Sequence, residues 1–423
     1  MQHLLRRRLW AVVIGVLAAA GSAAGIAYAT GAIAGDSGGV VVGCAGKLLG
    51  ELRIVSDPSK CTRLERVVYL QAPVAPQPTS FTVDCTAGQK VQDVLNQVAA
   101  DTAPVTISVK GMCNEDVSIN RDSVTLTAAT GGAGARSLLL IDARKIQLHG
   151  LAFGAGGLHA DGSAFRADGI DVSGAQNGIV LNGGSIGWLT NATVENSTDT
   201  DIGVYNASTL EQFGGSLTRS GQHGLAVGSD SNAALTNVRI AGNGGGVAAG
   251  DAGSADLANC TIEHNTGIGV QAYAGGTVDL RDGTVVQFNG NTGVMATAAE
   301  ANILDAVISN NERYGVVAEG GRLLLSNGAT VVNNNGEGVG LGNGSSLDSG
   351  PGGVTIRGNS SHGIDLGDTS TASIPDPVQI VGNGGWGIWC EPSPATAVIR
   401  GLNGVISTVS GNAAGQIGCQ IVP

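Results

Sequence analysis

The chain has 423 residues and is rich in small side chains: 42% of its residues are hydrophobic and 69 are glycine, but only 3% are aromatic. There is enough apolar material for a core, and small aliphatic side chains must fill most of it because rings are scarce. The formal net charge of −12 argues against nucleic acids and anionic surfaces as partners, since both repel an acidic protein.

Residues 1–29 have the three-part pattern of a secretory signal peptide. Residues 6–8 are arginines, an apolar stretch covers residues 9–20, and small residues follow up to Ala29. We expect cleavage after Ala29 and an exported protein, located in the periplasm, at the cell surface or secreted, with no membrane span after cleavage. Two alternatives remain open: an uncleaved membrane anchor, for which the apolar stretch is short, and a lipid-modified start at Cys44.

Residues 30–70 are expected to form a small module that holds two of the cysteines. The segment 44–70, CAGKLLGELRIVSDPSKCTRLERVVYL, resembles a short bacterial module of the form Cys, Gly-x-Leu-Arg-Ile-Val, Cys and Glu, which stands ahead of fibrous or repetitive domains. It departs from that pattern at Tyr69, where a tryptophan is common, and the resemblance implies no chemistry. Residues 71–80 contain three prolines and predict a stiff, exposed linker.

The main domain is predicted to cover residues 81–423 and to begin with a short helix. In QKVQDVLNQVAA, residues 89–100, the apolar residues Val91, Val94, Leu95 and Val98 share one helical face. A helix of this kind suits the end of a strand array, because it covers an edge that would otherwise invite aggregation.

A strand-opening motif, a Gly or its substitute followed by alternating apolar residues, recurs along the domain. Its first residues are Gly178, Asp201, Gly224, Gly246, Gly267, Gly293, Gly315, Gly338, Gly363 and Gly387. The steps of 21–26 residues indicate a repeat architecture. Each period holds two or three runs of period-two alternation separated by Gly, Asn, Ser or Asp, which predicts strands and turns. Such a period makes one coil of a parallel solenoid, stacked about 4.8 Å from the next.

An asparagine precedes most of these glycines and is predicted to form a stacked column. The asparagines are Asn243, Asn265, Asn289, Asn310, Asn333, Asn359 and Asn383. In register, each side-chain amide bonds the same amide one coil away. The glycine that follows supplies a positive φ or lets another backbone segment approach closely.

The stretches NTGIGV (265–270), NNERYGVV (310–317) and NSSHGIDL (359–366) carry a family resemblance. They match the Asn-x-x-Gly-Ile-x-Val strand signature of the right-handed parallel β-helix repeat family, the pectate-lyase-like fold, which the chain resembles from about residue 105 to 420. The family contains extracellular polysaccharide-handling proteins, tailspikes and adhesins. The resemblance implies an all-β fold, a right-handed parallel β-helix of about 10–12 coils with a short N-terminal helical cap.

Seven cysteines in an exported chain predict disulfide bonds between sequence neighbours. The predicted pairs are Cys44 with Cys61, Cys85 with Cys113, and Cys390 with Cys419. The remaining cysteine, Cys260, aligns with Val238 at an inward position of the repeat. We therefore expect a buried free thiol that acts as a small hydrophobe.

The strand face that follows each motif glycine is expected to lack catalytic groups, because its outward positions carry almost no charge between residues 203 and 340. Lyases of the family need a calcium-binding acid cluster with a basic residue, and its hydrolases need paired carboxylates. We expect neither on this face. His223 and His362 lie six coils apart, so they cannot share a substrate bond and are expected to be turn residues in water.

One acid-rich patch is the candidate catalytic site. Its residues are His159, Asp161, Arg166, Asp168, Asp171 and Asp201. If a cation or a uronic-acid substrate binds, oxygen ligands in this long turn are where it would be held, so calcium is the one cofactor that the sequence suggests. The alternative is a solvated loop with no chemistry.

Trp386 and Trp389 are candidates for stacking on a sugar ring, and packing under the terminal coil is the alternative. We expect an exported scaffold whose smooth strand face binds a polysaccharide or cell-envelope glycan, or a second copy of the chain. The competing hypothesis is a polysaccharide lyase, epimerase or hydrolase that acts on an acidic polysaccharide, with its site in the loops of residues 159–201. A third is an adhesin or stalk unit.

Overall fold

The structure is a computed structural model, and it describes residues 40–46, 52–55, 57–63, 65–71, 77–375, 377–391, 398–400, 408–419 and 421–422. The expected signal peptide lies outside these residues. Contacts divide the chain into two units, Met1–Ala75 and Pro76–Pro423. The finer division into a module, a linker and a main domain stays a prediction. Among the described residues there is no helix with the length and apolarity needed to cross a membrane.

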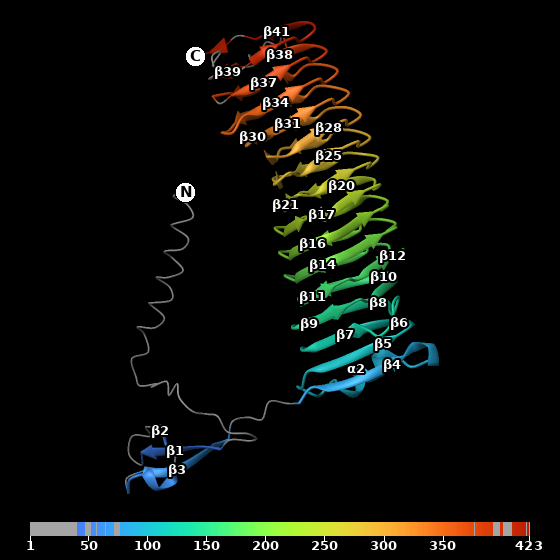
Figure 1. Ribbon diagram of the computed structural model, residues 1–423, viewed down its shortest axis with the longest axis vertical. Coiled ribbons are helices and arrows are strands. Elements are labelled where there is room, and N and C mark those ends of the chain that lie inside the picture. Colours follow the sequence, from blue (N-terminus) through green and yellow to red (C-terminus); the bar gives the residue numbers. More distant parts are fainter. Residues whose placement is uncertain are drawn as a thin grey trace. The chain divides into compact units, whose positions relative to one another are not determined.

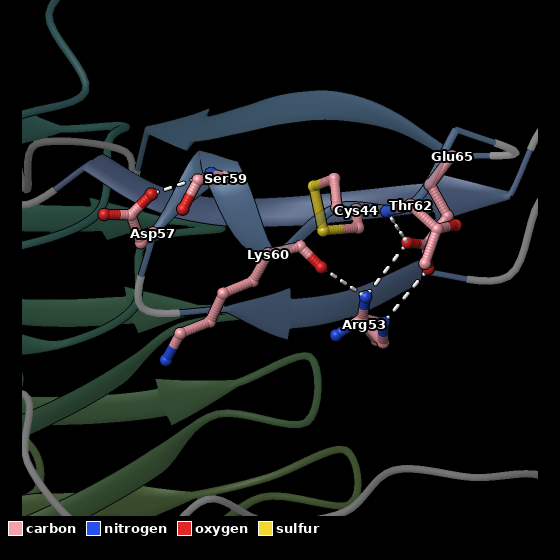
Figure 2. The surroundings of a disulfide bond; sticks show 8 residues. Cys44, Arg53, Asp57, Ser59, Lys60, Thr62 and Glu65 are labelled. Atoms are coloured by element: carbon pink, nitrogen blue, oxygen red, sulfur yellow. Dashed lines mark hydrogen bonds and ion pairs between the residues drawn. A yellow bond between two sulfur atoms is a disulfide. The ribbon is translucent and has the colours of Figure 1, made fainter.

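The first unit contains a three-stranded antiparallel sheet. Its strands are β1 (Val40–Gly46) at the centre, β2 (Leu52–Val55) and β3 (Glu65–Gln71), with a 3-10 turn η1 (Pro58–Lys60) between β2 and β3. Cys44 and Cys61 form the predicted disulfide. Figure 2 shows Arg53 beside it, donating to both carboxylate oxygens of Glu65, at 3.0 and 2.9 Å, and to the Lys60 carbonyl at 2.8 Å. The Arg of the Leu-Arg-Ile-Val motif thus ties β2 to β3 and to the loop between them.

The second unit is a coil of short strands that stack in sequence order (Figure 1). A coil contributes strands to three parallel ladders, and between the two ends of the unit each strand pairs with its equivalents one coil before and one coil after. We call these ladders sheets I, II and III, in the order in which a coil meets them. In the first coils, long strands such as β10 and β14 bend from one sheet into the next.

The strands of each sheet have the following bounds. Sheet I contains β4 (Thr79–Asp84), β5 (Val105–Lys110), β7 (Val124–Ala128), β9 (Ile146–His149), β11 (Ala164–Asp168), the first parts of β14 (Ile186–Glu195) and β16 (Thr209–Thr218), β18 (Asn232–Thr236), β21 (Ser254–Ala258), β24 (Thr277–Arg281), β27 (Glu300–Leu304), β30 (Arg322–Ser326), β33 (Ser346–Ser349), β36 (Thr371–Ser373), β39 (Val398–Arg400) and β42 (Ile421–Val422). Sheet II contains the first parts of β6 (Met112–Ile119), β8 (Gly134–Ile141) and β10 (Ala152–Asp161), β12 (Asp171–Ser173), the second parts of β14 and β16, β19 (Arg239–Ala241), β22 (Thr261–Glu263), β25 (Val285–Gln287), β28 (Val307–Ser309), β31 (Ala329–Val332), β34 (Val354–Arg357), β37 (Val378–Val381) and β40 (Thr408–Ser410). Sheet III contains the second parts of β6, β8 and β10, β13 (Ile179–Asn182), β15 (Ile202–Val204), β17 (His223–Val227), β20 (Gly245–Ala249), β23 (Val270–Tyr273), β26 (Val294–Thr297), β29 (Val316–Glu319), β32 (Val339–Gly342), β35 (Ile364–Leu366), β38 (Trp386–Cys390) and β41 (Gly415–Gly418).

The predicted all-β parallel helix is confirmed, with about 14 coils instead of 10–12. The glycine motif begins only at Gly178, whereas the first coils, from β4 to β12, open their strands with other residues and escape a count based on that motif. The predicted cap is helix α2 (Val91–Gln97), which packs on β6. Glu115 accepts a hydrogen bond from the first N–H of this helix at 2.7 Å, and Arg121 donates to the Val98 carbonyl at 2.5 Å.

Small aliphatic side chains fill the interior of the coil, as the composition predicts. Among the described aromatic residues, only Phe153 and Phe165 are fully buried. Cys260 is a buried free cysteine in the position of Val238, as predicted, and burial raises the pKa of its thiol to about 11. A thiol of this kind is protonated at neutral pH and serves as core.

The other two predicted disulfides are present near the two ends of the second unit. Cys85 bonds Cys113 and so ties the 3-10 turn η2 (Cys85–Ala87) to β6. Cys390 bonds Cys419 and so ties β38 to the segment after β41. Both bonds fasten the outermost coils, where strand pairing is lost on one side.

A column of buried asparagines runs between sheets II and III. Its members are Asn243, Asn265, Asn289, Asn311, Asn334, Asn359, Asn383 and Asn412. Asn334 shows the pattern: its backbone N–H and its Nδ2 both donate to Oδ1 of Asn359 at 3.0 Å, and its own Oδ1 accepts the same two bonds from Asn311. Its Nδ2 also donates to the Ile308 carbonyl at 3.2 Å. Each coil is thereby locked to the next.

The prediction is wrong by one residue at two positions of this column. Asn310 and Asn333 have positive φ values of 54° and 56° and form the turn that precedes the column, while Asn311 and Asn334 lie inside it. Where Asn-Asn occurs, the sequence offers both residues for the column. The left-handed turn rotates the first one outward and leaves the second to bond.

The motif glycines stand opposite this column and are required for close approach, not for a positive φ. A Cβ on Gly315 would lie 2.6 Å from the Gly338 carbonyl oxygen and 2.8 Å from Nδ2 of Asn334. Asp201 occupies the same position in its coil, where the column holds the smaller Ser197 and Ser220. Its carboxyl group is fully buried, and burial raises its pKa to about 7 although the neighbouring Ser197 opposes the rise.

Replacing Asn334 with Ala should lower the free energy of unfolding by about 3 kcal/mol, because donors on Asn311 and the Ile308 carbonyl lose buried partners. The matched control is Asn333→Gly, next to it in the sequence, which keeps the left-handed turn and should change stability little. Urea unfolding followed by circular dichroism compares the two variants. Equal losses would contradict the assignment of the column.

Asp201→Asn should remove a pH dependence of stability. Because the pKa of Asp201 is about 7 in the folded chain and 3.8 ordinarily, the unfolded chain alone releases this proton between those values, so stability falls as pH rises from about 4 to 7. The loss is roughly 4 kcal/mol and is complete above pH 7. Urea midpoints should therefore differ most between wild type and variant at pH 8. The control Asp168→Asn removes a carboxylate at an exposed position, and a constant difference across pH would refute the account.

Candidate functional site

The outer face of sheet III is lined by one outward residue from each coil. In register these are His159, Val180, Gly203, Ala226, Ala248, Gln271, Met295, Val317, Gly340, Asp365 and Trp389. One predicted alignment is wrong by two residues, since Gly269 and not Gly267 pairs with Gly246. The sequence Gly-Ile-Gly-Val offers two registers, and only the stacked strands select one.

A hollow of about 370 Å³ opens on this face over coils β29 to β38. Three glycines leave the space: Gly340 stands between Val317 and Asp365 in the outward column, and Gly342 and Gly367 adjoin each other in the next. Longer side chains surround it. We call the hollow the acidic groove and define it by Tyr314, Glu319, Glu337, Asp365, Asp368 and Glu391.

Carboxylates dominate the charge of the acidic groove. Burial is the main cause that raises the pKa of Asp365 to about 6, and the negative charges of Glu391 and then Glu337 add to it. Oδ1 of Asp365 and Oε2 of Glu337 are buried without a hydrogen-bond partner. Glu319 accepts a bond from Nδ2 of Asn343 at 2.5 Å. No lysine or arginine lines the hollow among the described residues.

Two tryptophans stand beside the acidic groove. Trp389 follows Asp365 in the outward column, and its ring lies 5.3 Å from that of Trp386 and 5.9 Å from that of His362. The last coil packs against both rings: a Cβ on Gly418 would lie 2.5 Å from Trp389. The rings are only half-buried, so the packing role expected as the alternative leaves part of each ring open to a ligand.

The six candidate catalytic residues do not meet. His159 and Asp161 lie on β10 in sheet III, Arg166 and Asp168 on β11 in sheet I, and Asp171 on β12 in sheet II, while Asp201 is buried inside the coil. The segment expected to be one long turn is three strands on three faces. Arg166 instead stacks over the ring of Trp188, with its Cζ 4.6 Å from the ring centre.

The patch also offers no metal-ligand set. Among the described residues, the one group of three side chains close enough to hold an ion is Cys85, Cys113 and Glu115, and its two sulfurs already form a disulfide. The sequence named calcium only for the case that a cation binds in the patch, and the described residues bring no set of ligands together there for it.

The acidic groove was missed at the sequence level, and the expectation that this face lacks paired carboxylates is wrong. Glu319, Asp365 and Glu391 belong to the two outward columns of sheet III. Glu319 is the one acid of these columns within residues 203–340, and Asp365 and Glu391 lie beyond that stretch. The outward columns contain these three acids, but Glu337 and Asp368 lie in turns outside the columns, and only the structure brings all five to one hollow.

Residues 156–361 match the family described as right handed beta helix region. No curated protein matches the chain. Similar solved structures include the A-module of the mannuronan C-5 epimerase AlgE4 of Azotobacter vinelandii, with 16% identity, a TM-score of 0.48, and coverage of 76% of this chain and 95% of that one.

Two other solved structures are similar. The periplasmic alginate epimerase AlgG has 10% identity, a TM-score of 0.43 and coverage of 82% and 86% of the two chains. The catalytic unit of a GH87 α-1,3-glucanase of Streptomyces thermodiastaticus has 12% identity, a TM-score of 0.40 and coverage of 91% and 84%. The match over residues 156–361, together with the stacked parallel coils and the buried asparagine column, identifies this region as a right-handed β-helix.

Proposed function

We propose that the protein binds a polysaccharide on the outer face of sheet III, with the acidic groove as its main contact. The observation that carries the proposal is the hollow itself: about 370 Å³ left by three glycines and surrounded by hydrogen-bonding side chains. Ligand sites in proteins are typically hollows of roughly this size, or somewhat larger, with a few well-placed polar groups. A purely structural role of this face would not explain why three glycines leave a hollow at one place.

The groups around the acidic groove suit a sugar chain. Carboxylates such as Glu319 and Glu337 accept hydrogen bonds from hydroxyl groups. Arg313 stacks over the ring of Tyr314 and His362 over that of Trp389, and the parts of these half-buried rings that stay open offer apolar surface for the C–H side of a sugar ring. Outward positions repeat along the axis at about 4.8 Å, so the face presents its groups in a straight row. A row of contacts fits a polymer better than a single small molecule.

Export supports this proposal, since a glycan of the envelope or surroundings would be the natural partner there. The three disulfides fit an oxidising compartment, in line with the predicted signal peptide. Self-association of the chain stays a prediction. The uncharged and acidic surface of sheet III gives no support to the expected alternative of an acidic polysaccharide, because a uronate would meet like charge.

Glycoside hydrolysis is a second candidate, favoured by the raised pKa of Asp365. A carboxyl group that keeps its proton to about pH 6 beside the carboxylates Glu337 and Glu391 has the division of roles that glycosidases use for acid and base. Release of reducing ends from a retained polysaccharide, lost in Asp365→Asn and declining above pH 6 as Asp365 ionises, is the expected result. Retention without any product would dismiss hydrolysis and leave binding in place.

Gly340→Leu should block the acidic groove and lower glycan retention at least about tenfold. The position tolerates a side chain, because a Cβ there would meet only Val317, at 3.6 Å, and its φ is not positive. Retention on a glycan array measures the effect, and thermal melting checks the fold. The matched control is Thr330→Leu, which adds the same side chain to sheet II of the same coil. Unchanged retention in Gly340→Leu would refute the proposed site.

A further inference from the structure

Two carboxylates of the acidic groove, Glu337 and Asp365, lack the arginine partners that several carboxylates have elsewhere on this protein. On sheets I and II, several acids are neutralised by arginines one coil away, as in Arg281 with Asp256 and Arg239 with Glu263. Within the described part of the chain, Glu337 and Asp365 form no ion pair with a lysine or arginine. Each instead has one oxygen that is buried in the hollow without a hydrogen-bond partner.

Resting on the proposed function, we propose that the acidic groove selects a polysaccharide that carries protonated amino groups, such as a deacetylated amino-sugar chain. An ammonium group brings three donors and a positive charge to Oε2 of Glu337 and Oδ1 of Asp365, which accept no hydrogen bond in the structure. Hydrogen bonds between charged partners are roughly twice as strong as neutral ones. A uronate chain would add negative charge to Glu337, Asp365 and Glu391, which already repel one another.

The geometry favours a polymer-borne amine over a free metal ion. No three carboxylates of the acidic groove come within ligand distance of one another, since the one such group among the described residues lies at Cys85, Cys113 and Glu115. The acids line a hollow of about 370 Å³ instead of converging on a point. Such spacing suits several positive charges distributed along a chain, and Trp389 stands where the chain would leave the hollow.

The test compares ligands that differ only in charge. Glucosamine oligomers of one length are titrated in fully deacetylated and fully N-acetylated form, together with an oligo-uronate of equal length and with calcium chloride alone. The deacetylated oligomer should bind on the order of tenfold more tightly than its acetylated twin, and increased salt should reduce the preference. The double variant Glu337→Gln with Asp365→Asn should bind both forms equally, with its affinity for the acetylated form unchanged.

A control separates the acidic groove from the general acidity of the protein. Glu211→Gln with Asp93→Asn removes the same two charges at exposed positions on sheet I and helix α2 and should keep the preference. Loss of the preference in this control, tighter binding of the uronate, or calcium-dependent binding would each overturn the inference. Equal binding of both glucosamine forms, blocked by Gly340→Leu, would overturn it while the proposed function stands. If Gly340→Leu weakened the binding of none of the oligomers, both the inference and the proposed function would be contradicted.

Discussion

The register between coils is the constraint on which the structure depends. Each strand pairs in parallel with the same strand one coil away, so every inward residue lies over an inward residue and every outward residue over an outward one. A slip of one residue would move apolar side chains to the surface and polar ones into the core. The buried asparagines make such a slip expensive, because each amide reaches only the amide directly above or below it.

The fold was accessible from the sequence because a solenoid repeats its local chemistry. The glycine and asparagine spacing, the small aliphatic interior, the cap around Val91 and Leu95, and the buried Cys260 all follow from residues that act within one coil or between neighbours. Ambiguity arose where the sequence repeats itself at short range. Asn310-Asn311 and Gly267-Ile268-Gly269 each offer two registers, and backbone dihedrals and strand pairing decide between them.

The candidate site shows why nearness in sequence misleads in such a fold. Asp161, Asp168 and Asp171 lie within one coil and face three directions, because the chain turns from sheet III to sheet I to sheet II across them. Glu337, Asp365 and Glu391 are separated by about a coil each and line one hollow. Contacts across coils can be predicted from a sequence only when the register is known to within one residue. The acidic groove requires this for both outward columns of sheet III, because residues of both line it.

The placement of aromatic residues has a consequence for spectroscopy. Trp188, Trp386 and Trp389 are all half-buried on outer faces, and none lies in the aliphatic interior. The intrinsic emission of the described part of the chain therefore originates at its surface. A bound chain that covers Trp389 would be seen directly in that emission without any added label, whereas melting of the coils from β16 to β36, which carry no indole, would pass almost unseen.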